Sequence, residues 1–145
     1  MTLQTASEVI SFAKKLEEDC AKFYENLAQR YTNDREALLS FANENRRNIV
    51  LIERAYYGVI TDAIEGCFSF QINANKYMFE TKLAENASYN AALNKAVEME
   101  EKIIKFYSDA AEQSKSLMAD IPRTFAMIAK KRNIRSSKLK SLQRL

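Results

Sequence analysis

The stretch LEEDCAKFY at residues 16–24 recurs in the second half of the chain as MEEKIIKFY at residues 99–107. In both copies a Glu follows an apolar residue, and a Phe-Tyr pair begins six residues after that Glu. Apolar residues recur around each copy at spacings of three and four, which is typical of a helix with one apolar face. A second helical pattern follows each copy. The chain is therefore predicted to consist of two helical hairpins built on one plan.

The composition also favours long helices in a single domain. The chain has 145 residues, of which 47% are hydrophobic, and it contains only two Gly and one Pro. Such a chain has few turns and enough apolar residues to build one core without metal or disulfide bonds. No stretch reaches the roughly 20 apolar residues that span a bilayer. No basic region followed by an apolar run marks a secretory signal, so a cytoplasmic protein with no membrane contact is expected.

Histidine is absent, which excludes Ser-His-Asp chemistry and every metal motif that contains His. The two cysteines, Cys20 and Cys67, lie far apart in the sequence and form no Cys-x-x-Cys pair, so they are expected to be ordinary thiols. Two cysteines are also too few for a rubredoxin-type iron site or an iron–sulfur cluster. No cofactor is therefore expected.

Capping residues predict the boundaries of the first hairpin. The first helix is expected to begin near Thr5 or Ser7, because residues 5–8 have the form of a capping box. A Thr-Asn-Asp segment ends it and caps a second helix, which is expected over residues 34–57 with Gly58 as its stop.

The second hairpin follows a long connection. Residues 58–88 are interpreted as a crossover with one or two short helices. A third helix is expected to start near Asn86 or Ser88 and to reach about Leu117. The fourth opens with Asp120 as its cap and Pro122 in the first turn, where a missing N–H costs little. This order is that of an all-α four-helix bundle with one long crossover between helices 2 and 3.

Polar residues interrupt the apolar face of each predicted helix at similar heights. The first and third helices each carry one Glu in this position, the second carries two Asn three residues apart, and the fourth carries two Arg three residues apart. Residues three apart share one face of a helix, so each pair is predicted to point to the same side. The six positions are Glu17, Asn45, Asn48, Glu100, Arg132 and Arg135.

In this pattern the chain resembles the rubrerythrin and ferritin-like di-iron proteins. That family places one Glu on each of two helices and Glu-x-x-His on each of the other two. Glu17 and Glu100 fall where the two single Glu ligands are expected. The segment FANENRRN at residues 41–48 is similar to the family's Ala-Glu-Glu-Glu-Lys-Arg-His segment, with Asn45 in place of Glu and Asn48 in place of His.

On the fourth helix, Ile128-Ala129 sets the register of the resemblance. Arg132 then replaces the family's Glu, and Arg135 replaces its His. The chain is thus similar to a degenerate member of the superfamily that lacks both Glu-x-x-His motifs. The resemblance implies a ferritin-like up-down four-helix bundle, with residues 1–145 forming a single ferritin-like (rubrerythrin-like) helical domain.

The expected ligand set has lost its chemistry. Iron requires anionic carboxylates and neutral imidazoles, whereas two amides are poor ligands and two guanidinium groups are not ligands. The six residues are therefore predicted to be vestigial metal-site positions with neither a metal nor a catalytic role. Glu44, Glu53 and Glu101 flank these positions and are the carboxylates left for a reduced metal site.

Buried carboxylates without a metal carry a severe desolvation cost. We therefore expect Glu17 and Glu100 to pair with Arg132 and Arg135, while Asn45 and Asn48 complete the hydrogen bonds. In the alternative, the glutamates lie at the edge of the core, the asparagines are ordinary register-setting residues, and the arginines extend into solvent.

The sequence is consistent with three functional hypotheses. The leading one is a non-catalytic bundle that acts through self-association, with a homodimer expected, or through a protein partner. The runner-up is a metal-binding oxidoreductase or iron-handling protein with a reduced carboxylate site. The third is binding of nucleic acid or another polyanion to the basic end of the fourth helix, because residues 130–145 carry seven basic residues and no acidic one. The alternative for this basic end is a solvated helix terminus that complements the helix dipole.

Overall fold

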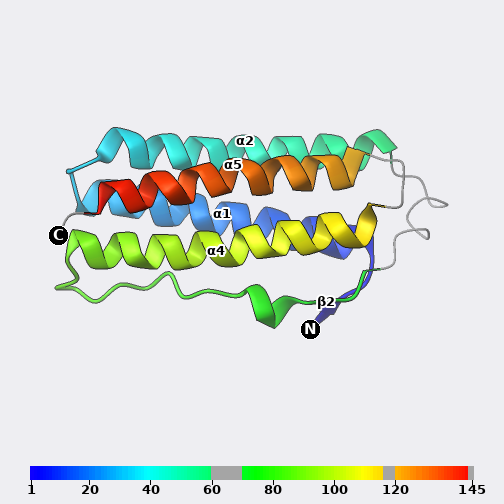
Figure 1. Cartoon of the computed structure of the whole chain (residues 1–145), viewed down its shortest axis with the longest axis horizontal. Helices are drawn as coiled ribbons and strands as arrows, with labels where there is room; N and C mark the ends of the chain where they lie inside the picture. Colours follow the sequence, from blue (N-terminus) through cyan, green and yellow to red (C-terminus); the bar gives the residue numbers. More distant parts are fainter. Residues whose placement is uncertain (60–69, 116–119, 144–145) are drawn as a thin grey trace.

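The computed structural model describes residues 1–59, 70–115 and 120–143. Within these ranges the chain forms four long helices, namely α1 (Ala6–Arg30), α2 (Arg35–Val59), α4 (Tyr89–Ser114) and α5 (Asp120–Leu142). Figure 1 shows them side by side in one bundle. Helix α1 packs against α2, α4 packs against α5, and α2 and α5 join the two hairpins. The predicted all-α four-helix bundle is confirmed.

The connection between the hairpins gives the bundle its topology. Residues 70–88 run along the length of the bundle, so that α4 starts at the end where α2 also starts (Figure 1). Helices α2 and α4 therefore run in one direction, and α1 and α5 run in the other. The four helices thus run up, down, down and up, in a bundle with the predicted long crossover between its second and third helices.

Short elements fasten this crossover to the bundle. Strand β2 (Ile72–Asn73) pairs antiparallel with β1 (Thr2–Leu3), with Leu3 opposite Ile72. The 3-10 helix η1 (Ala74–Tyr77) follows, and the Tyr77 hydroxyl donates a hydrogen bond to Asp109 on α4. Further along, Arg30 at the end of α1 donates to the carbonyl oxygens of Ala84 and Glu85, at 2.5 and 2.6 Å.

The first helix begins as its sequence predicts. Thr5 is the N-cap of α1, and its side-chain oxygen accepts the Glu8 N–H at 3.1 Å. The Glu8 carboxylate in turn accepts the Thr5 N–H at 3.0 Å, which completes the capping box. Ser88 caps α4 in the same way by accepting the Ala91 N–H.

Two predicted boundaries are wrong. Helix α2 continues through Gly58 to Val59, and Gly58 has no positive φ, so it is not the left-handed stop that was expected. Asp120 is the first residue of α5 rather than its cap, and it forms an ion pair with Arg123 at 3.7 Å. The described part of helix α4 reaches Ser114, and the predicted end near Leu117 lies outside the described residues.

Other expectations are only partly tested. Of the one or two short helices expected over residues 58–88, the described part contains η1. Cys67 falls outside the described residues. None of the helices described in the structure is long and apolar enough to cross a membrane.

Candidate functional site

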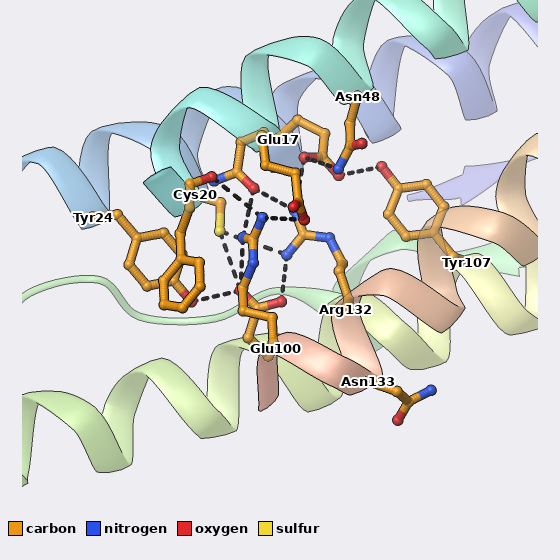
Figure 2. Close-up of polar contacts among 12 residues, drawn as sticks. Glu17, Cys20, Tyr24, Asn48, Glu100, Tyr107, Arg132 and Asn133 are labelled. Carbon is orange, nitrogen blue, oxygen red and sulfur yellow. Dashed lines mark hydrogen bonds and ion pairs between the residues drawn. The ribbon is translucent and has the colours of Figure 1, made fainter. Parts of the chain in front are cut away.

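A cluster of charged and polar side chains lies in the middle of the bundle, where an apolar core would be expected. All six residues singled out in the sequence are in it, and each side chain is at most 2% exposed. Figure 2 shows how the side chains converge from the four helices. Glu17 comes from α1, Asn45 and Asn48 from α2, Glu100 from α4, and Arg132 and Arg135 from α5.

Arg132 is the centre of the cluster. One of its terminal nitrogens donates to Glu17 Oε1 at 2.7 Å and to Asn45 Oδ1 at 3.2 Å. The other terminal nitrogen donates to Glu100 Oε1 at 2.5 Å. A single guanidinium group therefore bridges the two buried carboxylates, one from each hairpin. The predicted pairing of glutamate with arginine is confirmed.

Arg135 forms the second half of the cluster. Its Nη1 donates to Asn45 Oδ1 at 2.6 Å and to Glu100 Oε2 at 3.3 Å. Its Nη2 donates to the Phe41 carbonyl oxygen at 3.2 Å and to Glu44 Oε1 at 2.9 Å. Glu44 was expected only to flank the site, but it is the fifth charged member and, with a side chain 36% exposed, the one that reaches the surface.

The two tyrosines of the repeated sequence cross between the hairpins. The Tyr24 hydroxyl on α1 donates to Glu100 Oε2 on α4 at 2.6 Å, and the Tyr107 hydroxyl on α4 donates to Glu17 Oε2 on α1 at 2.6 Å. Each repeat thus supplies one carboxylate and the hydroxyl that binds the other repeat's carboxylate (Figure 2). Sequence reasoning missed this role, although the signal was present, because a Tyr follows each Glu by seven residues.

Asn48 and Cys20 make the weaker contacts. Asn48 Nδ2 donates to Glu17 Oε1 at 3.3 Å, so Asn48, and not the half-buried Ile49, faces the core. The Cys20 thiol lies 3.6 Å from Glu100 Oε2 and 3.7 Å from an Arg132 nitrogen. Burial, together with the negative charge of Glu100, raises the pKa of Cys20 to about 12. The thiol is therefore protonated at neutral pH and is not a nucleophile.

The electrostatics of the cluster favour charged partners. Burial by itself raises the pKa of Glu100, but the positive charges of Arg132 and Arg135 outweigh it, and the pKa lies below the ordinary value of 4.5. Burial works against the charge of Arg132 as well, yet the carboxylates of Glu100 and Glu17 hold its pKa well above its ordinary value. The formal charges of the four deeply buried groups, two Glu and two Arg, sum to zero.

The hydrogen bonding of this cluster is incomplete. Among the described residues, four buried polar atoms have no hydrogen-bond partner. An unpaired buried polar atom lowers the stability of a fold by about 1–3 kcal/mol, so these atoms reduce the net stabilisation that the cluster provides. The four atoms are Asn45 Nδ2, Asn48 Oδ1, Arg132 Nε and Arg135 Nε.

These residues do not fit a di-iron centre. In the part of the chain that the structure describes, no three His, Cys, Asp or Glu side chains are arranged to hold a metal ion. The carboxylates of Glu17 and Glu100 already bind guanidinium groups, whose positive charge would repel a cation. Glu53 and Glu101 do not join them, because they pair with Lys14 at 3.0 Å and Lys140 at 4.0 Å on the surface.

The acid sensitivity of the fold should depend on Glu100. Its pKa is lower in the folded chain than in the unfolded chain, so this carboxylate stabilises the fold above the ordinary pKa of 4.5, and the contribution is lost as the pH falls through the folded value. We expect the stability difference between wild type and Glu100→Gln, measured by urea unfolding, to shrink as the pH is lowered from 7 towards about 3. Parallel stability curves for the two proteins would contradict this assignment.

The tyrosine crossing predicts a second set of effects. Tyr24→Phe and Tyr107→Phe each remove a donor from a buried carboxylate oxygen, so each should lower the free energy of unfolding by about 1–3 kcal/mol. Tyr57→Phe is the matched control, because Tyr57 is 69% exposed and should change stability by less than about 0.5 kcal/mol. Chemical denaturation of the three variants checks this, and a loss no larger than the control's would show that the crossing bonds contribute nothing.

The fold and the site together define a class, an all-α four-helix bundle with an ion-pair cluster at its centre. Comparison of the chain with protein-family models, with curated proteins and with solved structures gives no match.

Proposed function

We propose that the chain is a ferritin-like, rubrerythrin-like bundle in which an ion-pair cluster has replaced the di-iron site. In this proposal it is a non-catalytic cytoplasmic protein that acts by association, either with itself as a homodimer or with a protein partner. The long crossover is the topology that this superfamily uses. The observation that carries the proposal is the position of Arg132, whose guanidinium lies between the two glutamates that match the family's single Glu ligands, at 2.7 and 2.5 Å.

A charged cluster makes physical sense as the product of metal loss. Two carboxylates freed of their cation would leave two negative charges in the core, at a cost of several kcal/mol each. Two arginines on one helix restore neutrality at that position. Replacement by apolar residues would often be as stable or more so, and the unpaired polar atoms show that the cluster is not optimised for hydrogen bonding. Both facts favour replacement of an older site over selection for stability alone.

Self-association is supported by an apolar stripe on α2. Leu39, Val50 and Tyr57 are exposed large apolar residues separated by eleven and seven positions, spacings that place them on one side of the helix. A homodimer through this stripe is the simplest association that the surface offers.

The metal content of the purified protein tests the proposal. The untagged protein is expressed with added iron, and elemental analysis is combined with an absorption spectrum and a molar mass from light scattering. We expect no stoichiometric metal and a mass above that of the 16.7 kDa monomer. Iron near two atoms per chain would support the runner-up, an oxidoreductase or iron-handling protein, and would overturn the non-catalytic reading.

A further inference from the structure

After its first residue, helix α5 carries charges of one sign only. From Ile121 to Leu142 the helix contains seven basic residues and no acidic one. Arg132 and Arg135 are buried in the core. Helix α5 therefore presents fewer cations on the surface than its sequence indicates. Figure 2 shows the next residue, Asn133, projecting away from the cluster. The other five basic side chains of the helix are exposed, and they are Arg123, Lys130, Lys131, Lys138 and Lys140.

Three of these exposed lysines have no acidic neighbour. Arg123 pairs with Asp120 and Lys140 pairs with Glu101, whereas Lys130, Lys131 and Lys138 form no ion pair with any described residue. In the described part of the chain, exposed cations without an ion pair occur on the other helices as well, for example Lys22 on α1 and Arg47 and Arg54 on α2. Helix α5 differs from these helices because no acidic residue follows Asp120 along it, so its unpaired lysines have no counter-charge on their own helix.

Exposed aliphatic side chains stand among these lysines. Met127 is 38% exposed and Ile134 is 65% exposed, and residues seven apart lie on one side of a helix. Lys130 and Lys131 fall between them, and Lys138 follows Ile134 by one turn. We name Met127, Lys130, Lys131, Ile134 and Lys138 the α5 outer face.

We propose that the α5 outer face binds an acidic, amphipathic segment of a partner protein, with carboxylates against the lysines and an apolar side chain against Ile134. Charge complementarity identifies the occupant, because three unmatched cations attract an anionic surface and disfavour a basic one. The aliphatic residues choose between two anionic partners. The phosphates of a nucleic acid bind lysine side chains, but they would leave Ile134 exposed to solvent. An amphipathic helix, in contrast, can bury its apolar side chains against Ile134.

This inference rests on the proposed function and goes beyond it by naming the surface and the chemistry of the partner. If the α5 outer face did not bind an acidic segment, this result could be distinguished from a failure of the proposed function, because the iron content of each protein preparation is measured separately. Iron at two atoms per chain would overturn the proposed function whatever the outcome for the α5 outer face.

Fluorescence anisotropy with three labelled probes tests the inference. The first is a helical peptide of about 18 residues, or five turns, with Leu on one side and Glu on the other. In the second peptide Gln replaces every Leu, and the third probe is a duplex DNA of similar length. Two variants, Lys130→Glu/Lys131→Glu and Ile134→Ser, alter the surface. Lys22→Glu/Lys82→Glu is the matched control, because it makes the same charge change at exposed lysines elsewhere.

We expect the leucine-containing peptide to bind best, and both surface variants to weaken it about tenfold or more while the control does not. Ile134→Ser should leave the weaker binding of the Gln-substituted peptide unchanged. Three results would overturn the inference. These are tighter binding of the DNA, equal losses in the control variant, and no binding of the leucine-containing peptide at about 1 mM protein, which corresponds to roughly 4 kcal/mol.

Discussion

Arg132→Ala should lower the free energy of unfolding by about 3–5 kcal/mol, the usual cost of leaving a buried charge without its partner. Arg132 is fully buried and bridges Glu17 and Glu100, and Arg135 contacts only the second of them. Glu17 therefore loses its one cation and keeps only the neutral donors Asn48 and Tyr107. This is a large share of the 5–15 kcal/mol that stabilises a typical domain.

Two further variants separate charge from volume. Arg132→Met keeps most of the side-chain volume, so a similar loss there assigns the effect to charge and not to a cavity. Adding Glu17→Gln to Arg132→Met should restore part of the stability, because no unpaired carboxylate remains beside the lost guanidinium. Lys131→Ala, at the exposed neighbouring position, should change stability by less than about 0.5 kcal/mol. A loss below about 1 kcal/mol for Arg132→Ala, measured by denaturant unfolding, would show that Arg132 does not neutralise a buried carboxylate.

The second large effect is a gain of metal binding. The fourfold variant Asn45→Glu, Asn48→His, Arg132→Glu and Arg135→His would restore the ligand types of the family at four positions, beside the native Glu17 and Glu100. Two cations would be removed and two carboxylates added, so the variant should be much less stable than the parent without metal. Cobalt(II) or iron(II) should then stabilise it by about 2.7 kcal/mol at a free concentration 100 times the dissociation constant.

Cobalt absorption and thermal unfolding with and without metal measure this gain. The triple variant that retains Arg132 is the control, since its guanidinium still lies between the two native glutamates. It should bind no stoichiometric metal. Equal metal binding by the triple and fourfold variants would show that Arg132 does not occupy the position of the ion. If neither variant bound metal, the result would contradict the proposal that the cluster replaced a di-iron site.

Much of the fold and of the cluster could be predicted because helix periodicity fixes which residues share a face. The spacing of apolar residues placed Glu17 and Glu100 inside α1 and α4. A three-residue step placed the Asn pair on one side of α2 and the Arg pair on one side of α5. Burial of the glutamates then required a cation, and Arg132 and Arg135 were the basic residues in the apolar face of α5.

What could not be predicted depends on the geometry between helices. The bridging of both carboxylates by Arg132 alone, rather than one arginine for each, follows from the distances across the bundle. The Tyr24 and Tyr107 bonds also cross between hairpins, and a spacing within one helix does not reveal a partner on another. Glu44 joined the cluster because α2 and α5 are in contact, which no local pattern encodes.

Anomalous diffraction distinguishes a guanidinium group from an iron ion between Glu17 and Glu100. Crystals of protein expressed with added iron are measured on both sides of the iron absorption edge, and the density between Glu17 and Glu100 is determined. We expect a planar guanidinium group of Arg132 within hydrogen-bond distance of both carboxylates and no anomalous peak there. An iron peak between the two carboxylates, or Arg132 and Arg135 extended into solvent, would contradict it.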